Sequence, residues 1–134
     1  GATALIDALH AAGVPLGVGS SGPPENVALV LDRLERRERF GAVVSRADVA
    51  RGKPAPDIFA LAGERLGADP GRCVVIEDAP PGVEAARAAM MRVVALLSTG
   101  RRRSDFADRP PDAFVDCLTE LDPGRLGRIA RGGG

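Results

Sequence analysis

The chain has 134 residues, a length that suits one domain with a buried core. Its 18 basic and 18 acidic residues cancel, and only 3% of the residues are aromatic. This composition argues against a general nucleic-acid surface, a membrane surface or an aromatic stacking platform. With no run of 18 apolar residues and no secretory leader, the sequence predicts a cytoplasmic protein. The two cysteines, Cys73 and Cys117, are interpreted as reduced core residues, because two widely separated thiols do not form a disulfide framework.

Hydrophobic spacing and turn residues predict an alternation of helices and strands. In chain order we expect a helix over 2–12, a strand over 14–19, a helix over 25–37, a strand over 40–45, a helix over 57–66, a strand over 73–76, a helix over 82–91, strands over 93–97 and 113–115, and a helix over 122–130. Such alternation is typical of a three-layer α/β/α fold with a parallel sheet. We interpret residues 1–131 as one domain and the glycines at 132–134 as a disordered tail.

Residues with chemically useful side chains lie next to several of the predicted strands and helices. Glu77 and Asp78 come directly after a buried strand, Ser20 and Ser21 follow another strand, and Lys53 precedes a helix. Right-handed crossovers place strand-to-helix turns at one edge of a parallel sheet, so we expect these side chains to share that edge.

The chemistry of these residues favours an anion and a cation at one site. Two adjacent carboxylates at a strand end repel each other and need a cation, although a solvated acidic loop is the simpler alternative. Lys53 is the only lysine among the 18 basic residues, which indicates a need for a compact ammonium there or else reflects chance. Hydroxyls at a helix N-terminus, an ammonium and a carboxylate pair that holds Mg²⁺ form a minimal set for phosphoryl chemistry.

Three segments resemble the motifs of the haloacid dehalogenase superfamily, in the branch of the β-phosphoglucomutases and phosphoglycolate phosphatases. These segments are VGSSG at 18–22, RGKPAPD at 51–57 and VIEDAPPGVEAA at 75–86. The resemblance implies a Rossmann-like core and a Mg²⁺-dependent hydrolase that acts on a small phosphorylated metabolite through an aspartyl-phosphate. It also implies site residues: catalytic Ser20 and Lys53, substrate-binding Ser20, Ser21, Gly22 and Lys53, and metal-binding Asp78 and Glu77, the last directly or through water.

Two positions depart from the family pattern. Ala79 stands where the family usually has a small hydroxyl residue, so we expect the loss of a hydrogen bond that would steady Lys53 or the carboxylates. Met90 stands where the family usually has glycine, and we interpret it as a packing variation.

A larger departure concerns the nucleophile. In the family, the nucleophile and the general acid are the two aspartates of an Asp-x-Asp motif at the end of an N-terminal strand, and this sequence contains no Asp-x-Asp. In the family's sheet that strand lies between the strands that end at Gly19 and Asp78. We therefore expect a fold that is incomplete without this central strand, with two half-sheets whose open edges close on each other or take a strand from another chain.

Three functions are consistent with these observations. The chain begins with Gly rather than Met, which favours the C-terminal portion of a phosphatase whose nucleophile and substrate-selecting cap lie outside it. The alternatives are an inactive fragment that binds or self-associates through its sheet edges, and a sugar-phosphate mutase. In each case we expect a small phosphorylated metabolite as ligand, and neither nucleic acid nor membrane as partner. The chain alone is expected to lack phosphatase activity.

Overall fold

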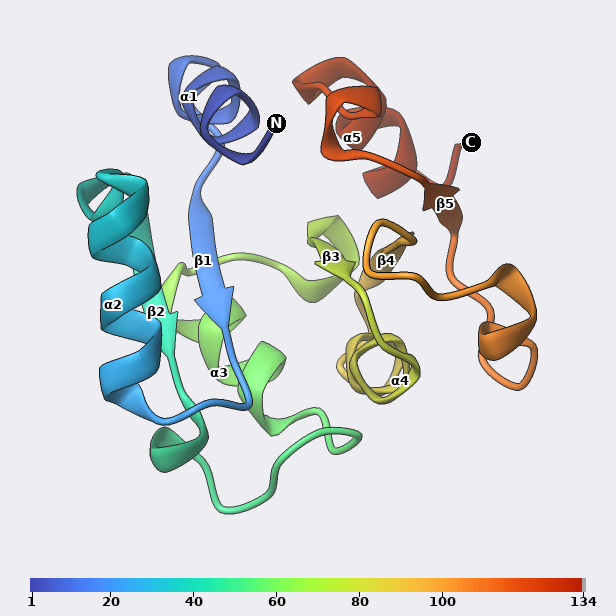
Figure 1. The fold of residues 1–134 in the computed structure, drawn as a ribbon, viewed down its shortest axis with the longest axis horizontal. Coiled ribbons are helices and arrows are strands. Elements are labelled where there is room, and N and C mark those ends of the chain that lie inside the picture. Colours follow the sequence, from blue (N-terminus) through green and yellow to red (C-terminus); the bar gives the residue numbers. More distant parts are fainter. Residues whose placement is uncertain (134) are drawn as a thin grey trace.

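The structure is a computed structural model that describes residues 1–133. Helices and strands follow one another along these residues. The elements are α1 (Ala2–Ala11), β1 (Leu16–Gly19), α2 (Pro24–Leu34), β2 (Phe40–Val44), α3 (Asp57–Arg65), β3 (Val74–Glu77), α4 (Pro80–Ala88), β4 (Arg92–Leu96), β5 (Ala113–Val115) and α5 (Pro123–Ala130) (Figure 1). The predicted α/β class is confirmed. Within residues 1–133, none of the helices has the length and apolar character needed to cross a membrane.

The strands form two separate parallel sheets. β1 pairs with β2, and β4 lies between β3 and β5. No ladder joins the two sheets in the described residues, so β1 and β3 are both edge strands (Figure 1). The predicted division into two half-sheets is confirmed, whereas closure of the half-sheets on each other is not seen. The ammonium of Lys53 lies between the ends of β1 and β3 and contacts both, as described below.

Apolar side chains form a buried cluster on each side of the sheets. One cluster joins α3 and α4 to β2, β3 and β4, and the other joins α1 and α5 to β3, β4 and β5. β4 contributes to both, because Val93 and Ala95 point into the first cluster and Val94 into the second, and all three are fully buried. This two-sided burial explains why β4 is apolar along its whole centre rather than alternating with polar residues.

Several helix boundaries differ from the sequence prediction by one to three residues, and two of these differences have a clear local cause. α2 ends at Leu34 rather than at 37, because Glu35 adopts a left-handed conformation with φ of 53° that a continuing helix does not allow. α4 begins at Pro80 rather than at 82, because a proline at the first helical position has no N–H to leave unpaired and already has a helical φ.

The cysteines are both free thiols, but only one of them approaches the core. Cys73 is half-buried just before β3, where desolvation raises the pKa of its thiol. Cys117 is exposed, so its predicted core position is wrong. It lies two residues beyond the end of β5, where the chain has already left the sheet.

The end of α5 is a hydrogen-bonded turn. The N–H of Gly132 donates to the carbonyl oxygen of Ile129 at 2.9 Å, and the N–H of Gly133 donates to that of Arg128 at 2.8 Å. Gly132 has a φ of 84°, which suits glycine just after a helix. Gly132 and Gly133 thus belong to this turn in the structure, whereas Gly134 lies outside the described residues; the disorder expected for 132–134 stays a prediction.

Met90 occupies a backbone conformation that favours glycine. Its φ is 64°, in the left-handed region, and 77% of its surface is exposed. The interpretation of Met90 as a packing variation is therefore wrong: it packs little, and the family's glycine would relieve backbone strain of about 1 kcal/mol.

We expect Met90→Gly to raise the free energy of unfolding by about 1 kcal/mol, measured by urea denaturation. Met90→Ala is the matched control, because it removes the same exposed side chain but keeps the Cβ atom that clashes at positive φ. An equal gain from both variants would show that the exposed apolar surface, and not the backbone, is the cause.

Candidate active site

The turn between β1 and α2 places the hydroxyl of Ser20 at the end of the first sheet. β1 ends at Gly19, and the N–H of Ser20 still pairs with the carbonyl of Val44 in β2. The Ser20 Oγ accepts a hydrogen bond from the N–H of Gly22 at 3.0 Å, which fixes the turn. Because this bond uses Oγ as an acceptor, the hydroxyl proton of Ser20 is free to donate to a ligand.

Lys53 reaches the same place from the loop between β2 and α3. Its Nζ donates to Glu77 Oε2 at 2.9 Å and to the carbonyl oxygen of Gly19 at 3.3 Å. Only 11% of its side chain is exposed. The single lysine of the chain therefore links the ends of the two sheets, and one of its three N–H donors is left for a ligand.

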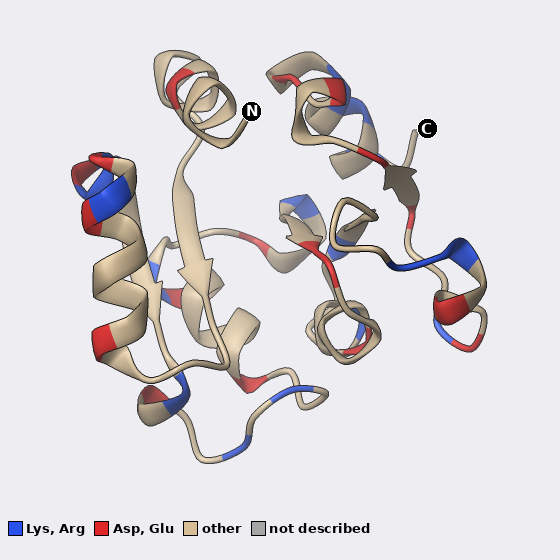
Figure 2. Cartoon of the chain, viewed as in Figure 1, with Lys and Arg blue, Asp and Glu red and all other residues tan. Residues whose placement is uncertain are grey.

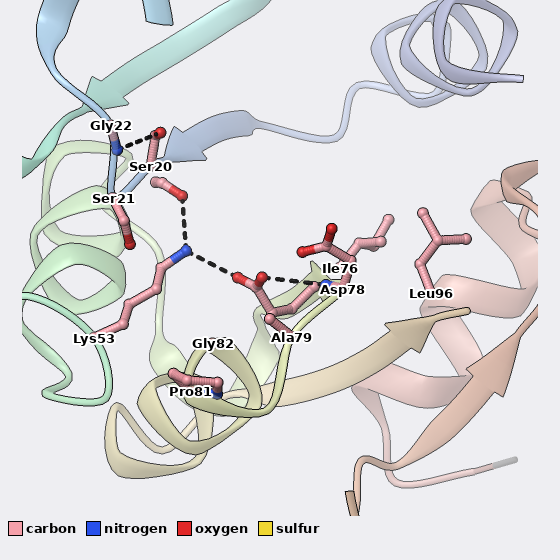
Figure 3. Close-up of a pocket in the computed structure, with 12 residues that line it drawn as sticks. Ser20, Ser21, Gly22, Lys53, Ile76, Asp78, Ala79, Pro81, Gly82 and Leu96 are labelled. Atoms are coloured by element: carbon pink, nitrogen blue, oxygen red, sulfur yellow. Dashed lines mark hydrogen bonds and ion pairs between the residues drawn. The ribbon is translucent and has the colours of Figure 1, made fainter. Parts of the chain in front are cut away.

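The two carboxylates at the end of β3 have different partners. The Glu77 side chain is 12% exposed, accepts a hydrogen bond from Lys53 and also accepts one from the N–H of Asp78 at 3.1 Å. The Asp78 carboxylate lies beside Ile76, apart from the Lys53 ammonium (Figure 3). Within residues 1–133 it forms neither a hydrogen bond nor an ion pair. Glu77 is therefore neutralised by the protein, and Asp78 is available to a cation.

These groups surround one pocket of about 610 Å³ between the two half-sheets. Its lining comprises Gly19, Ser20, Ser21, Gly22, Lys53, Ile76, Glu77, Asp78, Ala79, Pro81, Gly82 and Leu96 (Figure 3). All six residues named from the sequence thus lie at one pocket, where their roles stay predictions. Figure 2 shows basic residues in the loop before α3 and acidic residues at the end of β3.

Some pocket residues were missed from the sequence. Ile76 and Leu96 form an apolar wall on the second sheet, and their place at strand ends was the signal that could have found them. Nothing in the sequence singled out Gly82 except that it lies in the segment VIEDAPPGVEAA at 75–86. Although Ala79 has no hydroxyl to offer, Lys53 is still held by its bond to Glu77. Ala79 instead leaves α4 without a side-chain cap, because it is the N-cap residue.

The chain belongs to the haloacid dehalogenase-like hydrolase family, whose family model matches residues 1–89. This membership confirms the resemblance carried by the three motifs. Within the family, the similarity extends to phosphatases and to phosphoglucomutase-like proteins.

Three comparisons show which members the chain resembles. It is 41% identical to a bifunctional riboflavin kinase/FMN phosphatase of Arabidopsis thaliana, over 90% of this chain and 32% of that protein. It is 31% identical to the phosphoglycolate phosphatase of Salmonella paratyphi A, over 88% of this chain and 47% of that protein. A crystal structure of a HAD family hydrolase from Deinococcus radiodurans, with bound phosphate and sodium, aligns with a TM-score of 0.84 and 31% identity, over 98% of this chain and 59% of that chain. The chain thus spans about a third to three fifths of these proteins.

Proposed function

We propose that the protein is a Mg²⁺-dependent phosphohydrolase acting on a small phosphorylated metabolite. In this proposal the phosphoryl group passes to an aspartate supplied by a segment outside these 134 residues. The observation that carries the proposal is that Ser20, Lys53 and Asp78 lie at one pocket. Within residues 1–133, one hydroxyl proton, one ammonium proton and one carboxylate there form no hydrogen bond with the protein. A phosphate monoester needs this combination of donors and cation holder.

The chain's own residues would bind and orient the phosphoryl group. The Ser20 hydroxyl and the third N–H of Lys53 would donate to its oxygens. Lys53 would also offset the negative charge that grows on these oxygens in the transition state, an effect strengthened by its burial.

The carboxylates suit Mg²⁺ but do not complete a site for it. In residues 1–133 there is no group of three or more His, Cys, Asp or Glu placed to hold a metal ion. Mg²⁺ commonly binds through one or two carboxylates with waters and substrate phosphate, so Asp78 would hold it, with Glu77 as a neighbour directly or through water. When bound there, Mg²⁺ would neutralise phosphate charge.

The open edges of β1 and β3 support the delivery of the nucleophile on a strand. The N–H of Ser20 points to β2, so by the two-residue period of a strand the backbone groups of Gly17 and Gly19 point away from β2. The carbonyl of Cys73 accepts a hydrogen bond from the N–H of Arg92, the first residue of β4. By the same period, the backbone groups of Val74 and Ile76 point away from β4. One extended segment between the sheets could pair with both edges and would end at the pocket.

The proposal is tested by comparing the full-length protein with the 134-residue chain. We expect the full-length protein to release phosphate from monoesters such as p-nitrophenyl phosphate when Mg²⁺ is present, and the 134-residue chain to show no turnover. EDTA is the control for the metal. Turnover by the 134-residue chain that Lys53→Ala abolishes would place the nucleophile inside this chain and contradict the proposal.

The same open edges favour a second candidate, a module that associates with its own copies. Unpaired parallel edges are templates for strand addition, and two such edges face each other here. Sedimentation of the 134-residue chain, together with the activity assay, distinguishes the self-associating module from the phosphohydrolase. A concentration-dependent dimer with no phosphatase activity in the full-length protein would favour the module, whereas a monomer would exclude it.

A further inference from the structure

The Lys53 ammonium is enclosed by groups from three separate elements. Glu77 of β3 and the carbonyl of Gly19 in β1 accept its hydrogen bonds. The third group is the ring of Phe59 in α3, whose centroid lies 4.6 Å from Nζ. Phe59 is 7% exposed and belongs to the core cluster around α3 and α4, so its ring cannot move away without disturbing that core. A cation over an aromatic face is attracted to it, more so when water is excluded.

The Glu77 side chain in turn needs the space left by Gly82. A Cβ atom at position 82 would overlap Cγ, Cδ and Oε2 of Glu77. Gly82 lies in the first turn of α4 and is not among the glycines with positive φ. The helix therefore does not require glycine there, and alanine would be the better helix former. The glycine is explained by the carboxylate that lies against it.

We propose that Phe59 and Gly82 are positioning residues for Lys53. Phe59 would hold the ammonium directly with its ring, and Gly82 would act through Glu77 by letting that carboxylate lie close enough to accept the hydrogen bond. Their importance for turnover rests on the proposed function, but their effect on the place of Lys53 does not. Neither residue would touch the phosphate or the metal.

The first experiment uses the single lysine as a reporter. Lysine-selective ¹³C labelling of the 134-residue chain gives side-chain signals from Lys53 alone. The ring face of Phe59 should shift the Cε protons upfield, and Phe59→Leu should move them toward the position seen in urea. Phe59→Tyr keeps the ring and should restore the shift. Phe114→Leu is the control, because that ring contacts Phe106 and Arg103 instead. An unchanged Lys53 signal in Phe59→Leu would overturn the role of Phe59.

The second experiment distinguishes two causes for an effect of Gly82→Ala: overlap of the new Cβ atom with Glu77, or general damage to α4. Gly82→Ala should lower the urea midpoint and move the Lys53 signal when Glu77 is present. In a Glu77→Ala background the same change should raise the midpoint, because the overlap is gone and alanine favours the helix. Gly127→Ala in α5, whose Cβ would meet its nearest neighbour at 3.4 Å, should have the same effect in both backgrounds. The same sign for Gly82→Ala in both backgrounds would overturn the role of Gly82.

Activity assays on the full-length protein then tell this inference apart from the proposed function. If both hold, Phe59→Leu and Gly82→Ala lower kcat more than they raise KM, and Phe59→Tyr recovers kcat. A moved Lys53 signal without activity in any form, wild type included, would contradict the proposed function and leave the positioning role intact. An active wild type with an unmoved Lys53 signal in both variants would contradict the positioning role alone.

Discussion

Replacing Lys53 by methionine is expected to lower kcat of the full-length protein by about 10³-fold, the scale on which removal of a preorganised charge or donor at a transition state acts. Methionine keeps an unbranched side chain of similar length but has no proton to donate. Ser20 and Asp78 keep their places in this variant, so the affinity for the substrate should change much less than kcat. Phosphate release measured over a range of substrate concentrations separates the two effects.

The same substitution should destabilise the fold. It leaves the 12% exposed Glu77 carboxylate without its cation, at a cost on the order of 3 kcal/mol. The double variant Lys53→Met/Glu77→Gln removes both charges and should return to within about 1 kcal/mol of wild type, while remaining inactive. Urea denaturation of the 134-residue chain measures the free energy of unfolding of the wild type and of both variants.

Arg51 offers the matched control for Lys53. It lies in the same loop and pairs with Asp57 at 2.7 Å, but its side chain is 69% exposed. Arg51→Met should therefore change the free energy of unfolding by less than about 1 kcal/mol and leave kcat unaffected. A stable Lys53→Met variant would show that the pair with Glu77 carries little energy, and a kcat reduced by less than about tenfold would contradict the phosphate-binding role.

The location of the site could be predicted from the sequence because the rule behind it is topological. Parallel strands joined by helices bring their carboxyl ends to one edge, so Ser20 and Glu77 had to lie near each other once the alternation was recognised. The split of the sheet was instead an expectation from the family resemblance, which places the absent strand between β1 and β3. Neither inference required knowledge of a side-chain conformation.

Which partner each of the two carboxylates has depends on side-chain conformations. The family resemblance assigns both carboxylates to the metal, whereas in the structure Glu77 ends β3 and contacts Lys53 and Asp78 lies just beyond the strand. Which of them meets Lys53 depends on the space beside Gly82, in an element that follows β3. The contact of Phe59 with Lys53 could not be predicted from the sequence either. A phenylalanine on an amphipathic helix is expected to be a core residue, and only the structure shows its ring against the ammonium. The left-handed conformation of Met90 also depends on how the chain leaves α4 for β4.

The divergence of the carboxylates leads to opposite expectations for two conservative variants. Asp78→Asn should raise the Mg²⁺ concentration needed for half-maximal activity of the full-length protein by about 100-fold or more, since even groups outside the direct ligands contribute 10–100-fold to metal affinity. It should not lower stability, because the Asp78 carboxylate has no partner in residues 1–133 and amide replacement relieves its repulsion with Glu77. Glu77→Gln should lower stability, because Lys53 then loses its anionic partner.

Mg²⁺ titrations of phosphate release, together with urea midpoints, measure both properties for each variant. Asp116→Asn is the control, since this exposed aspartate also directly follows a strand, β5, but does not line the pocket. Equal losses of Mg²⁺ response from Asp78→Asn and Glu77→Gln, with stability unchanged in both, would mean that Glu77 serves the metal and that its contact with Lys53 contributes little. The expected contrast would instead mean that the protein uses one carboxylate of the pair to fix its lysine and keeps the other for the cation, so that two adjacent negative charges at a strand end are each neutralised by a different partner.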